Sequence, residues 1–403
     1  MEQISLKTGI FETVMKNAYY YYVALNLSSY AAIGMLLPLL GQYLDFLEFS
    51  GKQIGTITSV ATATAIFATT FWGEKYANSF RKKNVVIFLC VLSAIVGVGL
   101  LAVSSYWAFL IGFMVLYFFQ SPVMGLNDAM TIESGQPFSA IRKWGCIGFA
   151  LATFFAGRLA GEVGIFVIFP LYAMAFLLTA VAIVFILRME KSNRDVQQKW
   201  KNPPTEYKDK KQRIGYKEIL GNKKLMALIA SSFFLLGTNV ANNTYFSFLY
   251  MEGGGTLAGV GTVFLLMVGS ETVFMALSNR ISAKIGLERA ILIAMVISVL
   301  RFGWYSTGPA YTWLLAFFFL QGAVNGILLV EFIRYIHQTV EPSQLGLGIS
   351  LYYAISNNLS TIFCQFIGGL ALDSGGGPGV YLFFACYNII GVVLYLIFGL
   401  YKR

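Results

Sequence analysis

The sequence predicts an all-α integral membrane protein, in which twelve transmembrane helices form two six-helix bundles and both termini are cytoplasmic. Three observations lead to this prediction. Hydrophobic residues make up 57% and charged residues 12% of the 403 residues, whereas soluble chains contain about 45–50% and about 25%. The mean hydropathy of +0.68 describes the whole chain, which a single membrane anchor would not produce. The third observation is the even spacing of long apolar segments.

Each apolar segment is long enough to cross a bilayer, because a transmembrane helix needs about 20 mostly apolar residues. One long polar segment, from Arg188 to Lys224, separates the first six from the last six. We therefore expect an N-terminal bundle at 1–188, a cytoplasmic linker at 189–223 and a C-terminal bundle at 224–403. The twelve stretches are residues 17–44, 53–73, 84–104, 106–130, 143–163, 165–187, 224–250, 257–278, 288–307, 310–333, 346–372 and 378–400.

The positions of lysine and arginine predict the orientation. With both termini in the cytoplasm, 26 of the 29 lie in cytoplasmic segments. Lys52 and Arg158 fall outside, and Arg301 lies within a span. Cytoplasmic loops of membrane proteins carry such an excess of positive charge. The net charge of +10 is thus explained by orientation, and no nucleic-acid partner is expected.

Several functional classes are excluded. The single histidine, His337, and four cysteines without paired spacing offer neither a metal site nor a Ser/His triad. No GxxxxGK[ST] phosphate loop is present, which argues against an ATP-driven pump. We therefore expect no enzymatic activity, no cofactor and no metal. The expected protein is a monomer in a cell membrane, of the bacterial inner-membrane kind, whose partners are lipid and a small solute.

Two connections suggest that the halves are related. Residues 73–83 and 279–289 are both short and basic, and each follows the second helix of its half. Both resemble the loop signature of the major facilitator superfamily, although Ala77 and Ala283 replace the usual aspartate. The resemblance implies alternating access to a central site between the two bundles.

Further strings are similar to the lactose-permease-like branch of that superfamily. The resemblance implies that Arg142 binds a sugar and that Phe149, two turns later on the same helix, stacks on it. It also implies that Asp128 occupies the position of an acidic residue that binds the sugar. The strings that carry it are Arg142–Phe149, Asn127–Ala129, Gly34 with Pro38, Ser50–Gly55 and Phe332–Ile336.

The departures from that branch remove its own charges. Gln321 and Val324 stand where the branch has a coupling histidine and a protonating glutamate. Proton coupling in this chain must therefore use other carboxylates. Loss of both members of a buried charge pair is physically coherent, whereas loss of one would leave an unpaired charge. The residues in place of the two acid–base pairs are Asn239, Asn242, Phe318 and Asn357.

Ionisable side chains within the spans are candidates for function, because burying one in hydrocarbon costs about 2.5 kcal/mol or more. Asp128 and Arg142 are predicted to pair and bind solute hydroxyls; the alternative is a structural ion pair. Phe149 is either a stacking ring or a packing residue. Glu271 is predicted to carry the proton, and the alternative is a permanently neutral acid that ties helices together.

Arg301 needs an anionic partner, and Glu331 and Glu271 are the choices that the sequence offers. Together the three are predicted to manage the proton, although a static ion pair is an alternative.

A set of amides is predicted to line the path of a neutral, hydroxyl-rich solute. The alternative is a role in holding helices together. Asn243 and Asn358 accompany the set, and its main members are Asn239, Asn242, Gln321, Asn325 and Asn357.

The sequence therefore predicts a secondary transporter, and the resemblance implies that it moves a sugar, oligosaccharide or nucleoside by proton symport. Two alternatives stay open. One is a proton-driven exporter of lipophilic compounds, which the aromatic-rich composition would suit. The other is a membrane receptor that binds its ligand without moving it.

Overall fold

The computed structural model describes residues 2–197, 219–341 and 344–402, and every regular element in these ranges is a helix. Within them, ten helices are long and apolar enough to cross a membrane. The expected all-helical membrane protein is thereby confirmed. Residues 198–218, which make up most of the expected linker, lie outside the described ranges.

The helices of the first half are α1 (Glu2–Phe46), α2 (Gly51–Ala77), α3 (Lys82–Gly99), α4 (Tyr106–Glu133), α5 (Phe138–Val163) and α6 (Ile168–Gln197). Those of the second half are α8 (Lys223–Glu252), α9 (Leu257–Ile285), α10 (Leu287–Tyr305), α11 (Tyr311–Ala316), α12 (Phe319–Thr339), α13 (Leu345–Tyr352) and α14 (Ser360–Ile397). A π-helical segment, Tyr353–Leu359, joins α13 to α14.

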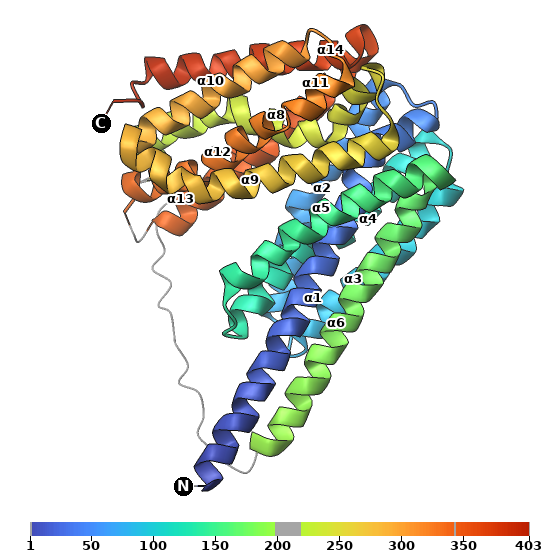
Figure 1. Ribbon diagram of the computed structural model, residues 1–403, viewed down its shortest axis with the longest axis vertical. Coiled ribbons are helices and arrows are strands. Elements are labelled where there is room, and N and C mark those ends of the chain that lie inside the picture. The colour runs from blue at the N-terminus through green and yellow to red at the C-terminus, as the bar shows by residue number, and fades with distance from the viewer. Residues whose placement is uncertain (1, 198–218, 342–343, 403) are drawn as a thin grey trace.

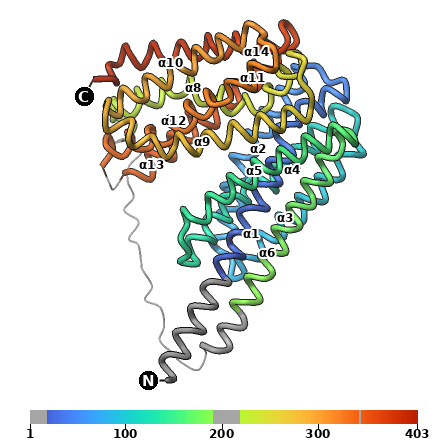
Figure 2. Tube along the Cα trace, viewed as in Figure 1, coloured from blue at the N-terminus to red at the C-terminus, as the bar shows by residue number. Residues whose placement is uncertain are grey.

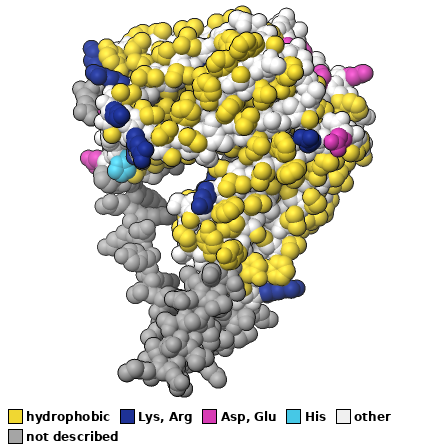
Figure 3. All heavy atoms as spheres, in the orientation of Figure 1, with side chains coloured by type: hydrophobic (Ala, Val, Ile, Leu, Met, Phe, Trp, Pro, Cys, Tyr) yellow, Lys and Arg dark blue, Asp and Glu magenta, His cyan; other side chains and the backbone are white. Residues whose placement is uncertain are grey.

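The helices form two groups that meet at one end and diverge toward the other (Figures 1 and 2). Helices α1 to α6 pack together, as do α8 to α14, and the groups touch mainly through α2 with α14 and α5 with α9. We call the end where they touch, near Gly51 and Gly157, the closed end, and the opposite end the open end. Hydrophobic side chains cover most of both groups on the face seen in Figure 3, which is hollowed between them.

Four boundaries differ from the sequence prediction, and one of them is the start of α1, at Glu2 instead of residue 17. The expected helix at 310–333 is broken between α11 and α12. The last two expected helices are continuous in α14, which bends at Gly375 and Gly376; Gly376 has φ +59, a conformation that glycine adopts without strain. Helix α6 continues to Gln197, inside the expected linker. Charged side chains such as those of Glu190 and Lys191 favour helix as well as apolar ones do.

Glycines allow the two groups to approach closely at the closed end. A Cβ atom added at Gly157 of α5 would lie 2.8 Å from the carbonyl oxygen of Leu257 in α9. One added at Gly55 of α2 would lie 3.0 Å from Cα of Gly369 in α14. Larger side chains at these positions would hold the halves apart, so the glycines permit this closed arrangement.

A carboxylate also links the halves at the closed end. Asp373 of α14 accepts hydrogen bonds from the backbone N–H groups of Gly51 (2.5 Å) and Lys52 (2.8 Å), at the first turn of α2. These N–H groups have no partner within their own helix, and the helix dipole favours an anion there. Asp373 therefore caps a helix of the opposite half and stabilises the closed end.

Replacing Asp373 with asparagine is expected to favour opening of this end. The variant loses the negative charge at the helix N-terminus, worth about 1 kcal/mol, which corresponds to roughly a fivefold change in population. Spin labels at Ser105 and Thr307, in loops at this end of the two halves, report the change as a larger fraction of long distances. Asp45→Asn, at an exposed carboxylate of the same end, is the control. Equal distance distributions for both variants would contradict a stabilising role for Asp373.

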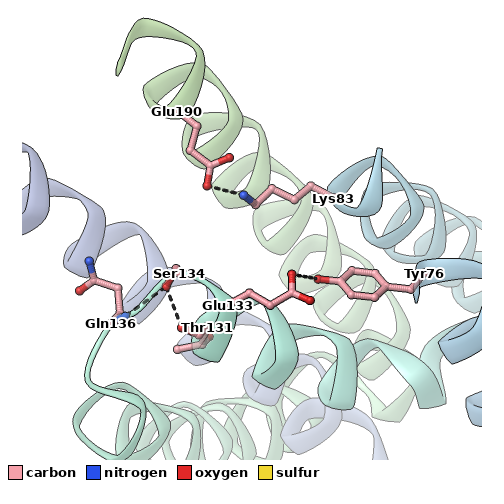
Figure 4. A network of polar contacts seen from close by, with 7 residues as sticks. All are labelled: Tyr76, Lys83, Thr131, Glu133, Ser134, Gln136 and Glu190. Carbon is pink, nitrogen blue, oxygen red and sulfur yellow. Dashed lines mark hydrogen bonds and ion pairs between the residues drawn. The ribbon is translucent and has the colours of Figure 1, made fainter. Parts of the chain in front are cut away.

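Away from the closed end, a polar network holds α2, α3, α4 and α6 together (Figure 4). Lys83 of α3 pairs with Glu190 of α6. Glu133 of α4 accepts a hydrogen bond from the Tyr76 hydroxyl (3.1 Å) and pairs with Lys82 (2.8 Å). The basic connection after α2 is thus anchored to two other helices of its own half.

Candidate functional site

A cavity of about 380 Å³ lies between the two halves and is lined by side chains from both. Helices α1 and α5 supply one wall, and α8, α9, α12, α13 and the π-helical segment supply the other. Eight of the residues predicted from the sequence line it: Arg142, Phe149, Asn239, Asn243, Glu271, Gln321, Asn325 and Asn357.

The N-terminal wall combines a cation with aromatic rings. The guanidinium carbon of Arg142 lies 4.1 Å from the centroid of the Tyr30 ring, and Phe149 lines the same cavity two turns further along α5. Arg142 Nε is 3.4 Å from Oδ1 of Asp128 on α4. This ion pair joins α4 to α5 beside the cavity. A guanidinium carries five N–H donors, so a single arginine can donate to several oxygens at once.

Two amides of the C-terminal wall hold a buried arginine. Arg301, whose side chain is 1% exposed, donates to Oδ1 of Asn239 (2.7 Å) and to Oε1 of Gln321. Its guanidinium also lies 4.2 Å from the centroid of the Phe302 ring. The amide oxygens thus replace carboxylates as the acceptors for this cation. At these two positions the side chains line the cavity and also tie α8, α10 and α12 together.

Glu271 lines the cavity from α9. Among the described residues no lysine or arginine lies within ion-pair distance of its carboxylate. Its side chain interacts with Asn325, and Arg301 acts on it electrostatically from beyond contact distance. Glu271 is therefore a carboxylate that faces the cavity without a fixed counter-ion.

The structure places two of the predicted residues away from the cavity. Glu331 is fully buried, accepts a hydrogen bond from Ser278 and lies 3.4 Å from Arg334, so the expected pair with Arg301 is not formed. Asn242 accepts a hydrogen bond from the Tyr381 hydroxyl at 2.7 Å. It lies on the face of α8 that packs within the bundle.

Aromatic residues that sequence reasoning did not single out complete the cavity. Tyr30 lies one helical turn before Gly34, a residue of the family resemblance, and so on the same face of α1. This spacing is the sequence feature that could have identified Tyr30. Tyr352 and Tyr353 line the wall together with Asn357, which lies in the π-helical segment. π-Helical turns occur often at functional sites, but the letters of this segment do not reveal one. The cavity lining thus includes aromatic and amide side chains, one cation (Arg142) and one carboxylate (Glu271). Such a lining suits a neutral, polar solute.

Comparison with known proteins identifies the family. Residues 17–383 match the model of the MFS_1 like family. The chain is 31% identical over 379 residues to the maltose permease of Geobacillus stearothermophilus, covering 92% of each chain. It is 28% identical over 389 residues to the uncharacterized transporter YwbF of Bacillus subtilis (strain 168), covering 93% of each.

Among solved structures, the crystal structure of a mutant of the nucleoside transporter NupG superposes with a TM-score of 0.79 at 18% identity. The match covers 94% of this chain and 99% of NupG, and at this identity it establishes the fold. The protein therefore belongs to the MFS_1-like family and is a multi-pass membrane transporter of the major facilitator superfamily.

Proposed function

We propose that the protein takes up a sugar, oligosaccharide or nucleoside by proton symport, through alternating access to the central cavity. The observation that carries the proposal is the lining of this cavity. Arg142 and Phe149 face several uncharged amides across it, and Glu271 faces it without a fixed counter-ion. The similarity to a maltose permease supports an oligosaccharide as the first solute to test.

In this mechanism the solute binds between the halves. Arg142, oriented by Asp128, donates to hydroxyl oxygens, Phe149 stacks on the apolar face of a ring, and Asn325 and Asn357 bind the opposite side. Glu271 takes up and releases the proton. Arg301 is the neighbouring cation that favours the ionised form of Glu271 once the proton leaves. Glu331 keeps a structural role between α9 and α12.

The proposal includes the topology. We propose twelve spans, obtained from the ten long apolar helices by counting α10 as a span and dividing the last apolar segment at Gly375 and Gly376. The halves at 1–188 and 224–403 then rock around the cavity, with both termini in the cytoplasm and one chain as the functional unit. The described structure, closed at the Asp373 end, corresponds to an inward-facing state.

Transport in proteoliposomes tests the proposal. Radiolabelled maltose and uridine are offered in turn under an inward proton gradient. Accumulation of either one that a protonophore abolishes is the expected result. Arg142→Gln is expected to remove this uptake, whereas Lys143→Gln makes the same charge change at the next residue, outside the cavity, and should retain it. Binding without accumulation of either compound would favour a receptor instead, and proton-driven efflux of lipophilic cations would favour an exporter.

A further inference from the structure

A second cavity, of about 430 Å³, lies on the outer side of the C-terminal half. Its walls are Leu300 and Trp304 of α10 together with Trp313, Phe317 and Leu320 of the segment that runs from α11 into α12. Leu300 is 66% and Trp313 58% exposed. In a membrane transporter such exposed apolar side chains face lipid, so the cavity opens to the bilayer and not to the central cavity.

Arg301 forms the polar part of this otherwise apolar wall. Its acceptors, on Asn239 and Gln321, are both neutral, and its Nε atom is buried without a hydrogen-bond partner. Among the described residues no carboxylate lies within ion-pair distance of it. A buried charge without a counter-ion is strongly unfavourable in a membrane interior. The cavity thus brings bilayer lipid to an arginine that lacks an anion.

We propose that this lateral cavity binds a fatty acid, with its carboxylate at Arg301 and its chain along the apolar walls. Charge complementarity selects the carboxylate, and the wall of leucine and aromatic side chains selects the chain. The depth of Arg301 in the bilayer also agrees with a bound fatty-acid carboxylate. Arg301 lies about one turn before the end of α10 at Tyr305, and Trp304 and Trp313 are of the residue type that marks the level of lipid headgroups.

A fatty acid bound at this site would also change the electrostatic effect of Arg301 on Glu271. A carboxylate that enters from the bilayer neutralises Arg301 without passing through the central cavity. Arg301 would then favour the ionised form of Glu271 less. The inference goes beyond the proposed transport function and is independent of it, because the cavity and its charge exist whatever solute the protein carries.

Equilibrium binding to the full-length protein tests the inference. The protein is placed in nanodiscs of phosphatidylcholine, and saturable binding of radiolabelled oleate is measured at alkaline pH. Leu300→Trp fills the cavity and is expected to weaken oleate binding by about tenfold or more. Ile293→Trp, two turns earlier on the same exposed face of α10 and outside the cavity, should leave the affinity within about twofold. Trp313→Ala, which removes an exposed wall ring, provides a second variant and should also weaken binding.

Competition distinguishes the possible occupants. Unlabelled oleate is expected to displace the label, whereas methyl oleate, which has the same chain without the charge, should not. Equal displacement by methyl oleate would show that the cavity takes any lipid chain and would overturn the inference. Displacement by benzoate at the same concentration would assign the site to a soluble aromatic acid, and displacement by phosphatidylglycerol to a phospholipid; either result overturns a fatty acid as the occupant. Unchanged oleate affinity in both cavity variants would do so as well.

Discussion

Glu271→Gln is expected to abolish uphill accumulation of the solute while exchange across the membrane continues. Glutamine keeps the size and hydrogen-bonding capacity of the protonated acid but can neither release nor take up a proton. The carriers can therefore still change conformation with solute bound, as exchange requires, but they no longer couple this change to a proton gradient. Accumulation and counterflow of labelled solute, measured in the same proteoliposomes, separate the two activities.

The matched control is Glu331→Gln, the same chemical change in the other buried carboxylate. Because Glu331 contacts Ser278 and Arg334 away from the cavity, we expect this variant to retain accumulation even where its stability is lower. The opposite result, with coupling lost at Glu331 and retained at Glu271, would move the proton site to α12. Accumulation that survives in both variants would remove Glu271 and Glu331 from the proton-coupling mechanism.

Replacing Asn239 and Gln321 together with leucine is expected to destabilise the protein severely. Both supply oxygen acceptors to Arg301, so the double variant leaves the buried guanidinium without either of these acceptors. Removing the partners of a buried charge costs about 3–5 kcal/mol. Adding Arg301→Met should recover much of this loss, because the charge that needed acceptors is then absent. Apparent unfolding temperatures of the purified variants measure both effects.

Asn242→Leu serves as the reference, since it removes one neutral hydrogen bond, with Tyr381, from the same helix. That loss is worth about 1 kcal/mol. A triple variant that is no more stable than the double one would show that the amides stabilise the bundle through packing rather than through Arg301.

Most of the fold follows from features that a sequence displays directly. Bilayer thickness fixes the length of each apolar stretch, so α2 to α5, α8 and α9 fall close to their expected ranges. The failures have local causes. The break at Phe317 interrupts a run that is apolar throughout, and hydropathy alone carries no signal for such a change of direction. The bend at Gly375 falls between the two expected stretches, where the sequence did signal a turn.

Site residues could be predicted from the sequence where the residue type alone requires a polar surrounding. They were harder to predict where their contacts depend on how the helices are arranged. Polar side chains in lipid-spanning helices must face a partner or a cavity, which brought Arg142, Asn239 and Gln321 into the prediction. Which partner each one meets depends on helix rotation. Arg301 was therefore expected beside Glu331 or Glu271 but lies against two amides. Tyr30 was missed because aromatic residues are too common in this chain for one of them to stand out.

The π-helical segment sets an angular relation between two distant parts of the last long helix. A π turn holds one residue more than an α turn, which rotates everything beyond it by about 100°. On one side of the segment Tyr352 faces the central cavity, and on the other side Asp373 reaches the first turn of α2. Converting this segment to regular α-helix without removing a residue would put these two faces about a quarter-turn out of phase. The ring at the solute and the carboxylate that closes the far end would then no longer point to their partners at the same time.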